Sequence, residues 1–158
     1  MGVQKLTIAN AIKAARKAHA EKRLGAQRKG VKKGERDCLY DYGDGVHRCG
    51  IGAGLTKATL AKIASENSND YPVGRLARSG LIKTDNIQAL STLQYLHDGW
   101  AMSRDVHEAL LLTGVDGSYN RVSAITKAHL VKKGYAFLDE AAFLCGLKFL
   151  ERLTRKVT

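Results

Sequence analysis

Apolar residues recur at helical spacing along most of the chain, and the first such stretch spans residues 7–24. One face of this stretch carries the core-facing positions Ile8, Ala11, Ile12, Ala15 and His19. The opposite face carries the basic residues Lys13, Arg16 and Lys17. This pattern predicts an amphipathic helix. Because its apolar face is rich in alanine, we expect another element to approach it closely.

Six further helices are predicted by the same periodicity together with capping and stop signals. Thr84 and Ser103 are the expected N-caps of two of them, and Gly80 and Gly99 are expected stops. The predicted ranges are 55–65, 73–79, 84–97, 103–113, 119–133 and 139–157.

Residues 36–50 have a different pattern, which predicts a β-hairpin. Two short apolar runs flank the segment Tyr42-Gly43-Asp44-Gly45, and Asp-Gly is a strong signal for a tight turn. A turn centred on Gly43-Asp44 sets Cys38 opposite Cys49. A turn centred on Asp44-Gly45 pairs Asp41 with Arg48, and the sequence leaves both registers open.

Length and composition fit these elements into one domain. The 158 residues, with a single proline and sixteen glycines, suit helices separated by glycine stops. The expected fold is therefore mainly α: a six- or seven-helix single domain, residues 1–158, with one small β-hairpin near residues 36–50. No apolar run approaches the roughly 18 residues of a membrane span, and no signal-peptide core begins the chain. We expect a protein of the cytoplasm (of a host cell), with no membrane partner.

The charge distribution points to a function. The net charge is +11, and residues 1–36 contain eleven lysines and arginines against only Glu21 and Glu35. A concentrated basic segment usually serves an anionic partner, most commonly nucleic acid, although a solvated basic helix or an acidic protein surface explains it too. The segment contains no aromatic residue, so we expect contacts to phosphates rather than to stacked bases.

The basic residues expected to contact nucleic acid or another anion all lie in this N-terminal helix and loop. They are Lys13, Arg16, Lys17, Lys22, Arg23, Arg28, Lys29, Lys32 and Lys33.

Three short segments share a pattern: Cys38-Leu39-Tyr40, then Cys49-Gly50-Ile51-Gly52-Ala53-Gly54-Leu55, and later Leu93-Gln94-Tyr95-Leu96-His97-Asp98. Together they resemble a group of small bacteriophage and mobile-element proteins that have no established activity, with Gly50 in place of the alanine usual in that group. The resemblance covers residues 38–98 and implies a phage accessory protein. Many small proteins of this kind act on host defence or host machinery, which is context for this chain and not an inference from its residues.

Metal-dependent chemistry has two candidate sites in the sequence. His97-Asp98 is typical of helical phosphohydrolases, but the further upstream histidine that such a site needs is missing, so a buried core histidine is the simpler interpretation. Cys38, His47 and Cys49, with Cys145 more distant, could bind zinc, but their spacing is not standard and buried cysteines explain them better. We expect neither a metal nor another cofactor.

Two further motifs could contact phosphate or DNA. The glycine run 50–54 precedes a helix but lacks the Walker spacing, and close packing explains its small residues more simply. Residues 59–82 have the rhythm of a helix-turn-helix, in which Arg75 and Arg78 would read the DNA. The connection between the two helices is too long for the standard motif.

These observations favour a non-enzymatic, phage-type accessory protein that binds an anionic partner through its basic N-terminal segment. The expected partner is nucleic acid or a nucleoprotein complex, which includes a host defence complex or another host protein assembly. The alternatives are a metal-dependent hydrolase using His97 and Asp98, and a structural virion or assembly protein.

Overall fold

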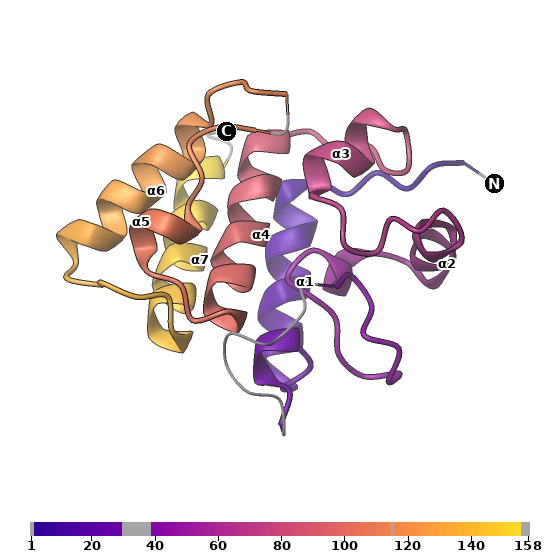
Figure 1. Cartoon of the computed structure of the whole chain (residues 1–158), viewed down its shortest axis with the longest axis horizontal. Helices are drawn as coiled ribbons and strands as arrows, with labels where there is room; N and C mark the ends of the chain where they lie inside the picture. The colour runs from indigo at the N-terminus through magenta and orange to yellow at the C-terminus, as the bar shows by residue number, and fades with distance from the viewer. Residues whose placement is uncertain (1, 30–38, 115, 156–158) are drawn as a thin grey trace.

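The computed structural model describes residues 2–29, 39–114 and 116–155, and within them the chain is almost entirely helical (Figure 1). The described residues form seven α-helices: α1 Ile8–Ala20, α2 Lys57–Ser65, α3 Val73–Arg78, α4 Ile87–Ala101, α5 Val106–Ala109, α6 Arg121–Lys132 and α7 Glu140–Thr154. Two short 3-10 helices, η1 Gly25–Gln27 and η2 Gly52–Gly54, lie between α1 and α2. The prediction of a mainly α fold with six or seven helices is confirmed.

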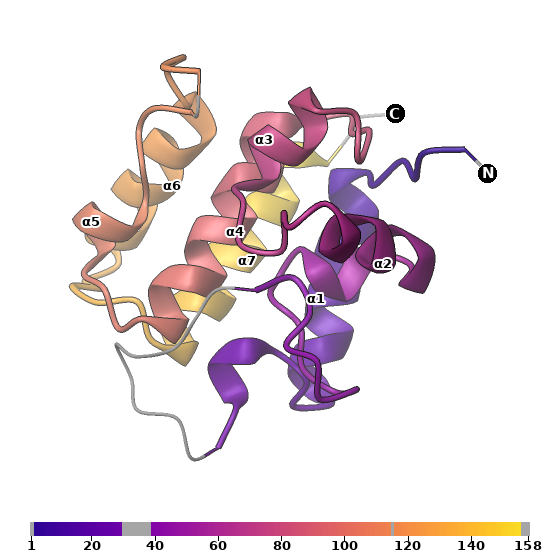
Figure 2. The same cartoon turned by 45° about the vertical axis from the view of Figure 1, so that its right-hand side comes forward.

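Helix α4 forms the centre of the molecule. It packs against α1, α3, α5, α6, α7 and η1, and most of its side chains are buried. In both views α1 and α6 lie on opposite sides of the pair formed by α4 and α7 (Figures 1 and 2). The basic face of α1 and the surface of α6 are therefore separate parts of the molecule.

Helix α1 packs closely through its small residues, as its sequence predicts. Ala11 and Ala15 are fully buried, and η2 lies directly against the helix. A Cβ atom placed on Gly54 of η2 would come within 2.9 Å of the Leu6 side chain and 3.7 Å of the Ala11 backbone. The small residues thus hold the 46–55 loop region against α1.

Two helices begin at residues other than those predicted. Asn86, not Thr84, caps α4 by accepting a hydrogen bond from the Ala89 N–H at 3.0 Å, while the Thr84 hydroxyl accepts one from Asn86 before the helix begins. Asp105, not Ser103, caps the short α5. Ser103 has a φ of 55°, which is incompatible with the extended backbone of an N-cap.

The β-hairpin predicted near residues 36–50 forms no strand in its described part, residues 39–50. The Tyr42 N–H donates to the His47 carbonyl and the Cys49 N–H to the Leu39 carbonyl, but these two bonds belong to different registers, so no ladder develops. The returning chain pairs with the segment after α1 instead. The backbone N–H of Arg48 donates to the Arg23 carbonyl at 3.0 Å.

Candidate anion-binding surface

The exposed side of α1 carries two of the predicted contact residues. Lys13 and Lys17 are exposed and lie one helical turn apart, opposite the buried alanines. Within the described residues, neither lysine forms an ion pair. Both ammonium groups are therefore available to an external anion.

Arg16, on the α7 side of the same helix, is already paired. Its guanidinium contacts both carboxylate oxygens of Glu151 at 3.3 Å, and Glu151 also lies 3.9 Å from Arg155. Arg16 thus connects α1 to α7, and Glu151 partly neutralises it. An incoming phosphate would have to compete with that carboxylate.

The end of α1 sets the direction of the next two basic residues. The Arg23 N–H donates to the Ala18 carbonyl and the Lys22 N–H to the His19 carbonyl, which is the Schellman pattern of helix termination. Lys22 occupies the left-handed position of this pattern, with a φ of 57°. The turn leaves Lys22 exposed and brings Arg23 alongside the last turn of α1.

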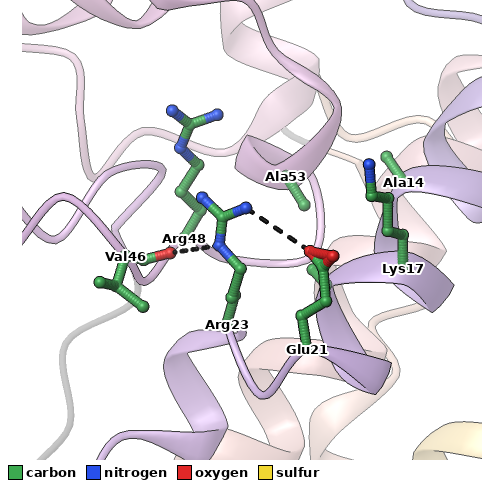
Figure 3. Close-up of a pocket in the computed structure, with 8 residues that line it drawn as sticks. Ala14, Lys17, Glu21, Arg23, Val46, Arg48 and Ala53 are labelled. Carbon is green, nitrogen blue, oxygen red and sulfur yellow. Dashed lines mark hydrogen bonds and ion pairs between the residues drawn. The ribbon is translucent and has the colours of Figure 1, made fainter.

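Beside this turn lies a small hollow, about 140 Å³ in volume, which we call the cationic pocket (Figure 3). Its charged lining residues are Lys17, Glu21, Arg23 and Arg48. The Arg23 guanidinium lies between Arg48 and Glu21, with Lys17 on the far side of Glu21 (Figure 3). Three cations from two segments of the chain and one carboxylate thus line the pocket.

Hydrogen bonds hold the two arginines of the pocket. The Arg23 Nε donates to the Val46 carbonyl at 3.2 Å, and its Nη1 lies 3.6 Å from Glu21. One Nη of Arg48 donates to the Leu55 carbonyl at 3.3 Å, and no described carboxylate is within ion-pair distance of Arg48. Each guanidinium keeps further N–H groups for a ligand.

The remaining predicted contact residues fall outside this pocket. Arg28 stacks over the Tyr42 ring, 4.3 Å from its centroid, and Lys29 is exposed. Lys32 and Lys33 lie outside the described residues.

Several cations near α1 were not predicted from the sequence. Arg48 reaches the pocket only because its loop pairs with the segment after α1, a contact that no local pattern signals. Lys148 and Arg152 are exposed on α7, and Arg155 is exposed directly after it, close to the Arg16–Glu151 pair. Their spacing of four and seven residues is the one sequence signal that they share a face. The positive surface therefore extends beyond the N-terminal segment.

His97 is a satisfied core histidine. Its side chain is fully buried, its Nε2 accepts a hydrogen bond from the Ala26 N–H at 3.1 Å, and its Nδ1 lies 3.0 Å from Asp98 Oδ1. These partners require a proton on Nδ1 and leave no lone pair for a metal ion. The arrangement does not support a metal-dependent hydrolase built on His97 and Asp98.

Gln94, one turn before His97, has a similar structural role. Its side-chain oxygen accepts a hydrogen bond from the Val73 N–H at 2.9 Å, and its nitrogen donates to the Tyr40 hydroxyl at 3.0 Å. That hydroxyl in turn donates to the Tyr71 carbonyl. The polar residues of the 93–98 motif therefore fasten three loops to α4.

The cysteines show no metal site in the described part of the chain, where no group of three or more His, Cys, Asp or Glu side chains could hold an ion. Cys49 is buried, and its Sγ accepts a hydrogen bond from the Gly52 N–H. Burial and the nearby Asp98 charge raise the pKa of Cys49 to about 12. Cys38 lies outside the described residues.

The glycine run is explained by packing, as predicted. A Cβ atom on Gly52 would lie 2.0 Å from the Tyr40 carbonyl oxygen, so only glycine fits there.

The helix-turn-helix considered for residues 59–82 does not form in its compact shape. Helix α3 has six residues, residues 66–72 separate it from α2, and Arg75 stacks on Tyr71. This stacking engages one of the two arginines expected to read DNA.

Comparisons with family models, curated proteins and solved structures find no match to this chain. Among the described residues, no helix combines the length and apolar character needed to cross a bilayer.

Proposed function

We propose that this protein is a non-enzymatic accessory protein that binds the phosphate backbone of nucleic acid, free or within a nucleoprotein complex. The observation that carries the proposal is a set of neighbouring cations, which we call the cationic surface: Lys13, Lys17, Arg23 and Arg48, with Glu21 as the one carboxylate of the pocket lining. It runs from the exposed side of α1 into the cationic pocket.

The arrangement of these cations favours phosphate over a carboxylate-bearing protein partner. Lys13 and Lys17 repeat at one helical turn, about 6 Å along α1, so both ammonium groups can contact phosphates of the same nucleic-acid strand. Arg23 and Arg48 add planar donors that suit phosphate oxygens. No aromatic side chain of the 2–29 segment is available for base stacking, so the contact is to the backbone and independent of sequence.

The phage-type part of the proposal depends on the resemblance of residues 38–98. Small phage proteins of this kind often interfere with host machinery or host defence. Sequence-independent binding to a nucleoprotein complex would serve such interference. The alternative of a virion or assembly protein has no specific observation in its favour.

Fluorescence anisotropy with a labelled DNA duplex tests the proposal. The double variant Lys13→Gln/Lys17→Gln removes two charges from the cationic surface, and Lys132→Gln/Lys133→Gln removes two from the distant end of α6 as a charge-matched control. We expect the first pair to weaken binding roughly tenfold and to reduce the salt dependence by about two counterions, while the control changes little. Equal losses in both variants would contradict the proposal.

A further inference from the structure

The cationic pocket differs from the rest of the cationic surface in being hollow and in having charges on several sides. We infer that it binds a phosphate monoester, and specifically the terminal phosphate of a nucleic-acid strand. This inference rests on the proposed function and names the group that the pocket recognises.

Charge complementarity supports a monoester over an internal phosphodiester. The pocket residues Lys17, Arg23 and Arg48 carry three positive charges, and Glu21 carries one negative charge. The resulting excess of two matches the charge of about −1.5 to −2 on a phosphate monoester at neutral pH. An internal phosphodiester carries a single negative charge.

The shape of the pocket also favours a phosphate monoester over an internal phosphodiester. The pocket has a volume of about 140 Å³, and the side chains of Ala14, Val46 and Ala53 help to form its walls. An internal phosphate is tethered through two oxygens, so the strand has to cross the rim on both sides. A terminal phosphate is tethered through one oxygen, so its remaining three can enter the hollow and accept hydrogen bonds from several directions.

The pocket is also preorganised. The backbone hydrogen bond from Arg48 to Arg23 fixes the two arginines side by side, and the Val46 and Leu55 carbonyls orient their guanidinium groups. A ligand therefore meets donors that are already ordered, which reduces the entropic cost of binding.

Glu21 opposes phosphate binding from within the site. Its carboxylate lies 3.6 Å from the Arg23 guanidinium, where it satisfies a donor group that a phosphate would otherwise use. Replacing Glu21 with glutamine keeps the shape but removes the competing charge. We therefore expect Glu21→Gln to bind a terminal phosphate more tightly than the wild-type protein does.

The test compares two otherwise identical DNA duplexes, one with 5′-phosphate and one with 5′-hydroxyl ends, by fluorescence anisotropy. We expect the wild-type protein to bind the phosphorylated duplex roughly tenfold more tightly, because the terminal phosphate gains charge-assisted hydrogen bonds at a partly exposed site. Arg48→Gln and Lys17→Gln should abolish this preference, and Glu21→Gln should increase it. Lys13→Gln, outside the pocket, should weaken both duplexes equally and leave the preference intact.

The outcomes separate this inference from the proposed function. If the wild-type protein binds both duplexes equally, or if the preference survives in both Arg48→Gln and Lys17→Gln, the pocket inference fails while backbone binding stands. A final arm adds inorganic phosphate to the 15N-labelled protein. In one outcome, phosphate shifts only the amide signals of residues 17–23 and 46–48 while the protein binds neither duplex. That result would contradict both the proposed function and the inference that the bound phosphate belongs to a nucleic-acid strand. The pocket would then be a site for free phosphate only.

Discussion

The imidazole of His97 accepts a hydrogen bond from the backbone N–H of Ala26, which lies 71 positions earlier in the chain, at a distance of 3.1 Å. This bond fastens η1, the turn that follows the basic helix, to the central helix α4. Asp98 fixes the proton on the other ring nitrogen. His97 and Asp98, which resemble a metal-binding pair in the sequence, thus hold η1 in place directly after the basic helix α1.

His97→Ala should lower the free energy of unfolding by about 2–4 kcal/mol, because it leaves a cavity in the core and removes the hydrogen bond from the Ala26 N–H to the imidazole. His107→Ala, at an exposed position, is the control and should change stability little. Thermal denaturation measures both variants. A chelator should leave the wild-type melting temperature unchanged, and a drop on chelation would revive the metal-site interpretation.

Gly52→Ala should destabilise the protein by more than about 2 kcal/mol, since its Cβ would meet the Tyr40 carbonyl oxygen at 2.0 Å and the backbone would have to move. Gly50→Ala is the matched comparison. Its Cβ would lie 3.1 Å from the His97 Cβ, a contact that a small shift relieves, so we expect a change within about 1 kcal/mol. Urea denaturation measures the free energy of unfolding of both variants. Similar decreases in the two would contradict the close contact between Gly52 and the Tyr40 carbonyl.

Cys145 should react with a thiol reagent under native conditions and Cys49 should not. Cys49 is buried with its pKa raised to about 12, whereas Cys145 is partly exposed with its Sγ 3.9 Å from the His129 Nε2. In a Cys38→Ser background, we expect one labelled thiol in the folded protein and two in denaturant. Peptide mass mapping identifies them. Rapid native labelling of Cys49 would contradict the buried loop.

Asp44 should make the 39–50 loop sensitive to acid. Hydrogen bonds from the His47 backbone and side chain and from the Val46 N–H lower the pKa of Asp44. Because its folded pKa is below the unfolded value of about 3.9, its contribution is present above about pH 4 and is lost as the pH falls toward the folded pKa.

Asp44→Asn removes this contribution and provides the comparison. The wild-type protein should be the more stable at pH 6, by no more than about 1 kcal/mol because the carboxylate is exposed, and the difference should shrink below pH 4. Thermal melts from pH 6 to pH 2.5 measure it. A constant difference across that range would show that the charge of Asp44 is not involved.

The sequence predicts the features that depend on local periodicity. The buried alanine face of α1, the order and approximate positions of the helices and the core role of His97 follow from residue spacing. Several helix ends do not: the expected stop Gly99 lies within α4, and α5 is only four residues long. The prediction of a β-hairpin was wrong because a strand forms only with a partner strand. The chain at Arg48 pairs with Leu24, after α1, and not with the segment before the turn. For the same reason Arg48 could not be assigned to the candidate site, since only the tertiary contact brings it beside Arg23.

Charge counting along the chain also has a physical limit. It identifies a basic segment but not which charges are neutralised in the fold. Arg16 is paired with Glu151 from the last helix, whereas Lys13, one turn earlier on the same helix, forms no ion pair within the described residues. The distinction between the two residues is visible only once α1 and α7 are placed together.

The most direct test of the cationic surface is a 1H–15N NMR titration of the full chain with a DNA duplex that has 5′-hydroxyl ends. We expect chemical-shift changes that concentrate on residues 13–23 and 46–48, spare α6, and fade as the salt concentration is raised. Changes centred on Arg75 and Arg78 of α3, or no salt-sensitive changes at all, would contradict it.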